Sequence, residues 1–497
     1  MKWDESDYFC SDLPTKPRPE IGTVLVTGAT GYVGGRLVPE LLNRGYRVRA
    51  MVRSSSLELH DRWLGAEMVV ADALEPDMLT RAMDGIDTAY YLMHSLYSGD
   101  EAFGESEIQA AKNFRETAEK VHVRRIIYLG PSWDVHAFHS PESGDRTEVG
   151  EELRKGSIPL TELSADAING SGSAFFELNK HLVKNCPLLL MPAWAKTICR
   201  PISIRDVIKY LVGVLEVPET SGGSFDIGGP DELTYEEMLK FLADILGKKC
   251  IFLPTRFSPI SLYAYISAFI TPVPAPITMC ILTGLEKAAV LRNDEIVKHL
   301  PFQTISYKEA ILRALSREER DRIYTRWSDA YPPANELAIK LDELEKTPHY
   351  TSAYSLVSGK KASSLFDSLC RIGGKEGWFH SNLLWRIRGF IDRILMGVGT
   401  SRGRRSPTEL MINDVIDFWR VEDLRKNRML LLRAEMKLPG RAWLQFKTDP
   451  EGEKTRLSVK AYYQADGFFG KLYWYFFLPF HAWIFQDLIT EIEKRSV

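Results

Sequence analysis

The sequence predicts an α/β protein built on a doubly wound parallel sheet, followed by a smaller α+β region. From residue 21 to about 325, short β-rich runs alternate with stretches whose apolar residues recur at helical spacing. The glycine-spaced stretch TGATGYVGGRL, at 27–37, joins the first run to the first helical stretch. Beyond about residue 350 the pattern changes to long runs of alternating apolar and polar residues. Apolar strands that alternate with helices form a parallel sheet covered on both faces.

The first region contains six expected strands and two clear amphipathic helices before residue 166. The expected strands are 23–28, 46–53, 66–72, 87–93, 124–130 and 159–165, and the helices lie within 34–45 and 104–122. A charged, polar stretch at 326–349 contains Pro332 and Pro333 and reads as a linker. The domain boundaries that we expect are therefore 1–20, 21–325, 326–349 and 350–497.

Composition excludes several classes of protein. The 497 residues are 45% hydrophobic and 26% charged, with a formal net charge of −3, so no global basic field draws the chain to nucleic acid. Six scattered cysteines without a Cys-x-x-Cys pair fit a reducing cytoplasm. Residues 1–20 are polar and lack the apolar core of a signal peptide, which predicts a loose tail or an arm laid on the surface.

One uncharged segment lies between Arg256 and Glu286 and is long enough to cross a bilayer. Pro272, Pro274 and Pro276 stand in its middle, where their missing N–H donors would disrupt a helix in lipid. The sequence therefore favours a buried lid or a segment lying at a membrane interface over a transmembrane helix.

The three glycines of the 27–37 stretch predict a dinucleotide-binding turn. Gly28 makes the tight turn after the strand, Gly31 lets the backbone approach a pyrophosphate, and Gly34 lets the helix pack against the sheet. The N–H groups at the start of the helix would face the phosphates. The cofactor-binding residues expected here are Thr27, Gly28, Ala29, Thr30, Gly31, Tyr32, Val33 and Gly34.

The end of the second strand favours NADP over NAD. A site for NAD carries Asp or Glu there to hold the ribose hydroxyls, whereas this strand ends in Arg53 and three serines. A guanidinium can bind the 2′-phosphate that distinguishes NADP. NAD remains the alternative cofactor, and a solvated surface arginine is the alternative role for Arg53.

TGATGYVGGRL, with Ala71-Asp72 after the third strand, resembles the short-chain dehydrogenase/reductase superfamily, in its extended, atypical branch of NmrA-like and complex I accessory subunit-like proteins. The segments RPISIRDVIKYLVGVLE and GGSFDIGGPDELTYEEML resemble substrate-side segments of that family, and the resemblance covers about 21–310. It implies that Asp72 and Ala73 lie near the adenine. It also implies that Leu92, Met93 and His94 pass under the cofactor, with Gly130 and Ser132 near the nicotinamide ribose.

The catalytic pattern of that superfamily is missing. Typical members use a tyrosine with a lysine four positions later, and none of the 20 tyrosines here has a lysine at that spacing. Where the helix with this pair is expected, the chain reads DRTEVGEELRKG. His94 and Ser132 are the catalytic candidates that remain, and His136, His139 and Glu148 are weaker substitutes.

Two further positions bear on the site. Asp166 stands after the sixth strand, where it could bond to a nicotinamide amide or disfavour cofactor binding. His136-x-x-His139 has no apparent third ligand, so no metal site is expected.

The region 350–497 resembles a poorly characterised domain that follows this type of reductase, with a pattern similar to the polyketide-cyclase and START helix-grip fold. RAEMKLPGRAWLQF and GKLYWYFFLPFHAWIF carry the resemblance, which implies a sheet around a long helix kinked at Pro479. Leu432, Ala434, Met436 and Leu438 are expected on the buried face, and Arg433, Glu435 and Lys437 on the other. The aromatic run 473–485 is most often core, and a lipid-binding pocket, a membrane interface or a partner protein are the alternatives.

Two hypotheses follow. The first is a cytoplasmic NADP-binding oxidoreductase or isomerase of the short-chain dehydrogenase type, with an unconventional active site, acting on a hydrophobic small molecule and in peripheral contact with a membrane. The second is a non-catalytic dinucleotide sensor, regulatory protein or assembly factor.

Overall fold

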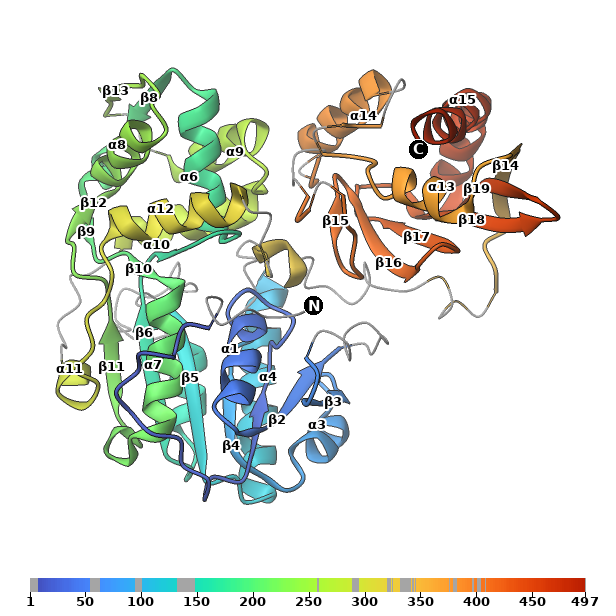
Figure 1. Cartoon of the computed structure of the whole chain (residues 1–497). Helices are drawn as coiled ribbons and strands as arrows, with labels where there is room; N and C mark the ends of the chain where they lie inside the picture. Colours follow the sequence, from blue (N-terminus) through green and yellow to red (C-terminus); the bar gives the residue numbers. More distant parts are fainter. Residues whose placement is uncertain are drawn as a thin grey trace. The chain divides into compact units, whose positions relative to one another are not determined.

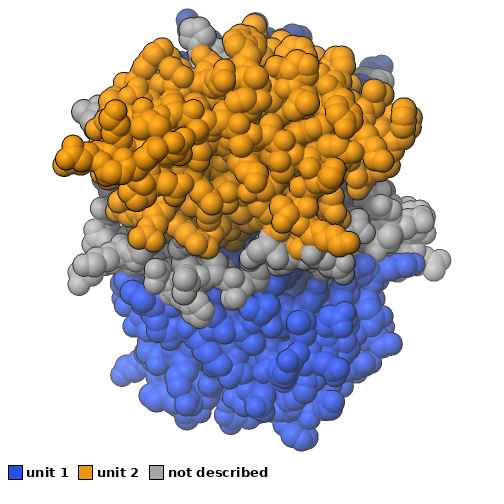
Figure 2. Space-filling model, turned by 90° about the vertical axis from the view of Figure 1, so that its right-hand side faces the viewer, with its two compact units in different colours: residues 1–270, 275–330 blue, residues 271–274, 331–497 orange. Residues whose placement is uncertain are grey.

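The computed structural model divides the chain into two compact units, which Figure 2 colours separately. Unit 1 comprises Met1–Ile270 and Ala275–Ala330, and unit 2 comprises Thr271–Pro274 and Tyr331–Val497. The structure describes residues 8–53, 63–93, 101–131, 148–256, 259–287, 295–319, 323, 325–330, 341, 344, 346–374, 376–378, 382–395, 397–399, 404–406 and 408–496. The two units are described separately below.

Unit 1 is built on a seven-stranded parallel sheet in the order β11-β6-β5-β4-β1-β2-β3 (Figure 1). The strands are β1 Thr23–Val26, β2 Arg47–Val52, β3 Glu67–Val70, β4 Ile86–Tyr91, β5 Arg125–Pro131, β6 Leu160–Ala165 and β11 Ser224–Ile227. The predicted doubly wound parallel sheet is confirmed. All six strands expected from the sequence are present, and β11 adds a strand at the edge.

Helices cover both faces of this sheet, which is why its strands are almost continuously apolar. On one face, α1 (Gly34–Asn43) and α7 (Ile204–Glu216) pack together, and their apolar side chains share one core with β1 and β2. On the other face, α3 (Pro76–Met83), α4 (Glu101–Lys120) and α5 (Glu148–Arg154) surround a second core built on Tyr91, Phe114 and Tyr128.

The remainder of unit 1 consists of short paired strands and helices. The paired strands are β7 Ile168–Asn169 with β10 Ile202–Ser203, β8 Leu188–Met191 with β13 Ile251–Pro254, and β9 Ile198–Cys199 with β12 Leu233–Thr234. The helices are α6 Ala174–Asn185, α8 Tyr235–Ile245, α9 Ile260–Ile270, α10 Ala275–Lys287, α11 Glu295–His299 and α12 Tyr307–Glu319, with short turns η2 Ala193–Lys196, η3 Pro218–Thr220 and η4 Trp327–Ala330.

The uncharged segment folds as the two helices α9 and α10, which pack against each other. The prolines account for the break, because Pro272 and Pro274 fall between the helices and Pro276 occupies the first turn of α10, where a missing N–H is tolerated. Within the residues that the structure describes, no helix combines the length and the apolar character that a membrane span requires.

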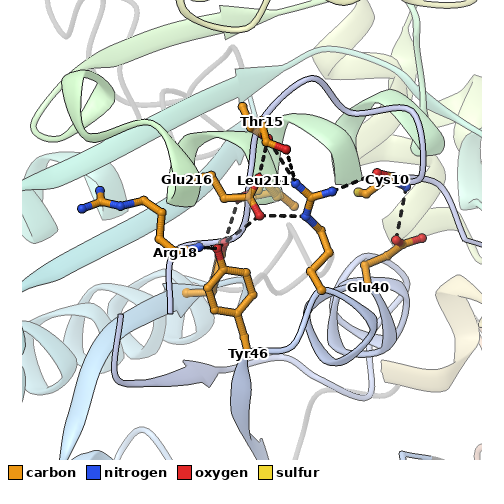
Figure 3. A network of polar contacts seen from close by, with 9 residues as sticks. Cys10, Thr15, Arg18, Glu40, Tyr46, Leu211 and Glu216 are labelled. Atoms are coloured by element: carbon orange, nitrogen blue, oxygen red, sulfur yellow. Dashed lines mark hydrogen bonds and ion pairs between the residues drawn. The ribbon is translucent and has the colours of Figure 1, made fainter. Parts of the chain in front are cut away.

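The N-terminal segment lies as an arm against α1 and α7, as Figure 3 shows for Cys10, Thr15 and Arg18. The backbone N–H groups of Phe9 and Cys10 donate to the carboxylate of Glu40 in α1. Lys209 of α7 donates to Asp12 over 2.7 Å. Of the two alternatives that the sequence left open for residues 1–20, the structure therefore places residues 8–20 as an arm rather than a tail.

Unit 2 contains a six-stranded antiparallel sheet in the order β14-β19-β18-β17-β16-β15. Its strands are β14 Tyr350–Ser358, β15 Val415–Ile416, β16 Trp419–Arg425, β17 Met429–Ala434, β18 Gly440–Glu451 and β19 Lys454–Ala465. Its helices are α13 Ala362–Leu369, α14 Asn382–Ile394 and the 29-residue α15 Gly467–Arg495, which contains Pro479. The expected antiparallel sheet with a long terminal helix is confirmed.

One face of this sheet packs against α13 and the second half of α15. The residues that α15 contributes to this core are Phe485, Leu488, Ile489 and Ile492. Leu432, Leu444, Leu457 and Val459 are fully buried on that face. The opposite face is less exposed than the alternation suggested. Arg433 is only 9% exposed to solvent, and Glu435 only 5%. Buried ion pairs, such as Arg420 with Glu435 and Arg433 with Glu422, explain how these charges are tolerated there.

The aromatic run in α15 is only partly core. Trp474 and Phe485 are 5% exposed, whereas Tyr475, Phe476, Phe480 and Trp483 are 62%, 64%, 44% and 59% exposed. The interpretation that the sequence favoured, a buried core helix, is therefore wrong for the first half of α15. The sequence does not mark the exposed face of the first half, because Lys471 is the only charged residue there.

Candidate functional site

The candidate site lies at the carboxyl edge of the parallel sheet, where its strand order reverses. β1 is hydrogen-bonded to β2 on one side and to β4 on the other, so the chain leaves β1 and β4 towards opposite faces of the sheet. In doubly wound folds this switch point is where ligands bind. The glycine-spaced turn follows β1 directly, which places it at the switch point.

Gly28 and Gly34 allow backbone approaches that no other residue permits. Gly28 has a φ of +61°, and a Cβ there would lie 2.5 Å from the carbonyl oxygen of Leu92. A Cβ on Gly34 would lie 2.3 Å from the carbonyl oxygen of Gly28. The turn is therefore pressed against the end of β4, and α1 starts directly beside it.

Thr27 joins the ends of the two central strands. Its hydroxyl donates to the carbonyl oxygen of Tyr90 over 2.9 Å and accepts the N–H of Leu92 over 3.2 Å. The Thr27 N–H also donates to Tyr90, and the side chain is fully buried. Thr27 thus positions the turn and the Leu92 segment, and Ala29, also fully buried, contributes only backbone to any ligand.

The start of α1 presents an uncompensated positive end. No acidic residue stands in its first turn, and its N-cap residue, Val33, offers no side-chain acceptor to the free N–H groups. Thr30, Gly31, Tyr32 and Val33 before it are partly exposed. Such a helix end favours an anion, and phosphate groups are the usual occupants.

Tyr32 faces the protein rather than the switch point. The guanidinium of Arg36 lies 4.2 Å from the centre of its ring, and the hydroxyl lies where a Cβ on Gly170 would be 2.6 Å away. Burial raises the pKa of Tyr32. Arg36 donates to the carbonyl oxygens of Tyr32, Ser171 and Thr325, so it fixes the back of the turn.

The remaining expected cofactor residues line the same edge of the sheet. Arg53 follows β2 and is exposed. Asp72 and Ala73 follow β3, where the Asp72 carboxylate accepts the N–H of Leu74 over 3.0 Å and the Ala73 carbonyl oxygen accepts from Asn113 over 3.1 Å. Leu92 and Met93 follow β4 and are partly exposed. The turn after β3 is thus held rigidly, and its carboxylate is partly exposed.

The catalytic candidates His94 and Ser132 lie outside the described residues, as do His136 and His139. Glu148 begins α5, the helix where the superfamily places its tyrosine and lysine. Four positions later Glu152 is 6% exposed and pairs with Arg115 over 3.0 Å and with Lys155 over 2.6 Å. Glu152 is therefore part of an ion-pair network between α4 and α5.

Tyr32, Tyr90 and Tyr91 are poor replacements for the missing proton donor. Burial raises the pKa of Tyr32, Tyr90 and Tyr91, the tyrosines nearest the switch point in the chain. A catalytic tyrosine needs the opposite shift, which a neighbouring cation would supply. Among the described residues, no group of three His, Cys, Asp or Glu side chains could hold a metal ion.

Asp166 is 6% exposed at the end of β6 and accepts the backbone N–H of Arg200 over 3.3 Å. Arg200 in turn donates to the Gly229 carbonyl oxygen over 3.2 Å and lines a cavity of about 550 Å³ with Asp226 and Tyr210. The sequence indicated Asp166 but not this cavity, because the residues that line the cavity are spread along the chain from Arg200 to Glu309.

Residues 20–294, more than half of the chain, match the NmrA-like family. The chain belongs to the NmrA-like family. Residues 344–488 match a second family, described as a protein of unknown function (DUF2867). The expected combination of an NmrA-like domain with an uncharacterised C-terminal domain is therefore confirmed.

Relatives of this NmrA-like chain have diverse names. The photosystem II assembly factor Ycf39 of Trieres chinensis is 22% identical over 46% of this chain and 70% of its own length. The 3 beta-hydroxysteroid dehydrogenase/Delta 5-->4-isomerase of Mycobacterium tuberculosis is 32% identical, but the match spans only 26% of this chain and 36% of that enzyme. The solved triphenylmethane reductase of Citrobacter sp., in complex with NADP(H), is 21% identical, with a TM-score of 0.47, over 59% of this chain and 99% of that one.

Proposed function

We propose that this NmrA-like protein binds NADP at the switch point and acts as an oxidoreductase or isomerase on a hydrophobic small molecule. The observation that carries the proposal is the turn at Gly28, pressed against Leu92 and followed by an α1 whose first turn has no acid. The peptide groups of the turn, including those of Thr30, Gly31, Tyr32 and Val33, would hold the pyrophosphate. Asp72 and Ala73 would border the adenine, and Leu92 and Met93 the path towards the nicotinamide.

Arg53 would select NADP through the 2′-phosphate. It is exposed at the carboxyl end of β2, where the fold brings the adenosine ribose of a dinucleotide. The test is titration of the full chain with NADPH and NADH, followed by nucleotide fluorescence. Arg53→Glu should weaken NADPH binding by more than about tenfold and change NADH binding little, because a charged hydrogen bond contributes about 1.5–3 kcal/mol.

Arg47 provides the matched control, since it is exposed at the opposite end of the same strand. Arg47→Glu should bind both nucleotides as the unaltered protein does. If Arg53→Glu keeps its preference for NADPH, the proposed 2′-phosphate contact is wrong. If neither nucleotide binds the unaltered protein, the dinucleotide site itself is wrong.

The chemistry would not use a tyrosine–lysine pair. When bound, the nicotinamide would supply or accept a hydride, and His94 and Ser132 are the residues that we propose for proton transfer and for orienting the substrate. The proposal predicts NADPH oxidation with a hydrophobic carbonyl or conjugated substrate, with a pH profile that changes in His94→Gln. A profile unchanged by this substitution would remove His94 from the mechanism.

A second candidate is a dinucleotide sensor or an assembly factor. It is favoured by Glu152, which is committed to Arg115 and Lys155 in the helix where catalytic residues are expected. An assembly factor also stands among the relatives. This candidate predicts NADPH binding without turnover on any hydrophobic ketone, enone or dye, together with a change in protease sensitivity when NADPH binds.

Unit 2 supports contact with a membrane surface. The first half of α15 exposes one apolar stripe, and residues 467–486 contain a single charged side chain, Lys471. The stripe consists of Phe468, Phe469, Leu472, Tyr475, Phe476, Phe480 and Trp483, each at least 44% exposed. Tryptophan and tyrosine with a nearby lysine are typical of helices that lie in the membrane interface.

Vesicle co-sedimentation tests this contact, with phosphatidylcholine and phosphatidylglycerol as the lipids. Phe476→Glu with Trp483→Glu should abolish sedimentation of the full chain. Phe241→Glu is the control, because Phe241 is a single exposed aromatic residue on α8 of unit 1. Equal sedimentation of all three proteins would exclude α15 as the contact, and failure of the unaltered protein to sediment with vesicles would exclude the membrane contact itself.

A further inference from the structure

Helix α14 of unit 2 has the reverse polarity of an ordinary surface helix, which buries its apolar stripe and exposes its charges. Its buried side carries Trp385, Asp392 and Arg393, which are 9%, 0% and 9% exposed. Its exposed side is apolar, and the residues there include Leu383, Ile387, Ile391, Ile394 and Leu395, each at least 45% exposed. These positions are three or four residues apart along the helix, so they form one stripe.

Specific contacts hold the polar side of α14 inward. The ring of Trp385 stacks on that of Trp378, with the ring centres 4.4 Å apart. Asp392 accepts the backbone N–H of Lys437 over 2.7 Å, and Arg388 donates to the Lys437 carbonyl oxygen over 2.7 Å. Rotation of α14 would bury its apolar stripe only by breaking these bonds and leaving Asp392 without them. The exposure of the stripe is therefore built into the fold of unit 2.

The loop 435–439, which joins β17 to β18 and includes Lys437, also holds the start of α15. The Pro439 carbonyl oxygen accepts the N–H of Asp466, the N-cap residue of α15, over 3.1 Å and the hydroxyl of Tyr463 over 2.7 Å. A Cβ on Gly470 would lie 2.4 Å from the same oxygen, so α15 packs closely against the loop. The exposed stripes of α14 and of the first half of α15 are thus attached at the same edge of the sheet.

Exposed basic residues accompany both stripes. They are Arg386 on α14, Lys437 in the loop and Lys471 on α15. The acidic residues within α14 and the loop, Asp392 and Glu435, are only 0% and 5% exposed, and 467–486 contains no acidic residue. The exposed acid next to these elements is Asp466. Apolar stripes with basic residues beside them are typical of helices that lie on membranes with anionic lipids.

We propose that α14 and the first half of α15 form one two-helix surface that binds a membrane containing anionic phospholipids. The proposal rests on the membrane contact proposed for α15, and adds to it a second helix and a class of lipid. The apolar stripes would lie among the acyl chains close to the headgroups, and Arg386 and Lys437 would contact lipid phosphates. A second copy of the chain is a less suitable partner, because it would bring the same basic residues together.

The contribution of α14 is tested by co-sedimentation of the full chain with vesicles of equal parts phosphatidylcholine and phosphatidylglycerol. Ile387→Glu should weaken binding at least about tenfold, because it removes an apolar side chain from the lipid and adds a charge that the lipid repels. Val357→Glu is the matched control, since Val357 is 46% exposed and Ile387 48%. Val357 lies on β14 opposite Arg456, at the other end of the sheet from the loop, and its substitution should leave binding unchanged.

The class of lipid is tested by a second variant, Arg386→Gln/Lys437→Gln. Its affinity for the mixed vesicles should fall at least about tenfold, and its affinity for pure phosphatidylcholine vesicles should change little. Lys447→Gln/Lys454→Gln is the control, because both lysines are exposed on the β18–β19 hairpin away from the loop. All of these positions are exposed, so the variants should fold as the unaltered protein does, which circular dichroism checks.

Each contrary outcome has a definite meaning. If Ile387→Glu sediments as the unaltered protein does while Phe476→Glu/Trp483→Glu does not, this proposal is wrong and the contact through α15 stands. If Arg386→Gln/Lys437→Gln keeps its affinity for the mixed vesicles, the class of lipid is wrong. If the unaltered protein does not sediment with either type of vesicle, both proposals are wrong. A lipid-free dimer that Ile387→Glu converts to a monomer in sedimentation velocity would show an interface between copies and would also overturn the proposal.

Discussion

Arg44 and Glu216 form a bidentate ion pair that joins the C-terminal ends of α1 and α7. Arg44 Nε lies 2.7 Å from one carboxylate oxygen of Glu216, and Arg44 Nη2 lies 2.6 Å from the other. Their side chains are only 12% and 0% exposed. Glu216 also accepts from the hydroxyls of Thr15 and Tyr46, so this carboxylate holds the N-terminal arm as well (Figure 3).

Glu216→Ala should lower the free energy of unfolding by about 3–5 kcal/mol, because it leaves the guanidinium of Arg44 buried without its partner. Urea unfolding followed by tryptophan fluorescence measures the change. The exposed pair Arg18–Glu20, with side chains 32% and 60% exposed, is the control. Glu20→Ala should change the free energy by less than about 1 kcal/mol. Equal effects of the two substitutions would contradict this assignment.

Gly28→Ala should abolish tight NADPH binding, because its Cβ would lie 2.5 Å from the Leu92 carbonyl oxygen and would force the turn away from β4. Gly45 is the matched control, since its φ is +86° and a Cβ there meets nothing within 4 Å. Gly45→Ala should lower the free energy of unfolding by only about 1–2 kcal/mol, the cost of a positive φ for an alanine. Nucleotide titration measures the NADPH affinity of both variants. Equal affinities would contradict the close contact between residue 28 and the Leu92 carbonyl oxygen.

Asp206→Asn should stabilise unit 1 at pH 8. Burial raises the pKa of Asp206 from 3.8 to about 6, so the folded state binds this proton more tightly than the unfolded state does. The contribution of Asp206 to the free energy of unfolding is fully present below pH 3.8, and it is lost as the pH rises through about 6. The gain in the asparagine variant is at most about 3 kcal/mol.

Thermal unfolding at pH 5 and pH 8 measures this effect. Asp206 stands in the first turn of α7, and Asp77 stands in the first turn of α3 but is exposed. Asp77→Asn is therefore the control for the loss of a carboxylate at that position of a helix. It should be neutral or slightly destabilising at both pH values. A destabilised Asp206→Asn at pH 8 would show that the carboxylate is needed in its charged form.

His481 should make unit 2 sensitive to acid. Burial lowers the pKa of His481 from 6.5 to about 4, and its Nδ1 lies 3.2 Å from the Ser352 hydroxyl. The stability that this neutral histidine allows is present above pH 6.5 and is lost as the pH falls towards 4. The loss should be about 2–3 kcal/mol.

In His481→Gln that acid-dependent loss should largely disappear, as measured by urea unfolding between pH 7 and pH 4.5. His349, an exposed histidine of the same unit, is the control, and His349→Gln should keep the pH dependence of the unaltered protein. An identical pH dependence in all three proteins would exclude His481 as the sensitive group.

The sequence predicted the elements whose signal is local. Strands such as 23–26 and 125–131, the turn at Gly28 and the hairpins of unit 2 follow from apolar periodicity and from glycine positions. It could not predict the arm at residues 8–20, because the carboxylates of Glu40 and Glu216, which accept from Cys10 and Thr15, come from helices distant in the sequence. The contact of Arg205 and Arg317 with the Phe9 ring escaped for the same reason, since these three residues meet only in the folded chain.

The exposure of α15 also required the structure. Alternation identifies the two faces of a strand, but the first half of α15, with Lys471 as its only charged residue, has no polar face that the sequence can mark as outward. The burial of Arg433 and Glu435 is the converse case, because their alternation with apolar residues indicated solvent. Arg420 and Glu422, both on the neighbouring strand β16, pair with Glu435 and Arg433 and neutralise both charges in the fold.

The bonds of Thr325 and Trp327 determine where the chain can be divided for expression. The Thr325 carbonyl oxygen accepts from Arg36, its hydroxyl donates to the Tyr32 carbonyl oxygen, and the Trp327 N–H donates to the Gly172 carbonyl oxygen. A fragment that stops at residue 294, where the family match ends, would leave the rear of the glycine turn without these bonds. A fragment that runs to residue 330, where unit 1 ends, keeps them and should still bind a nucleotide as the whole chain does.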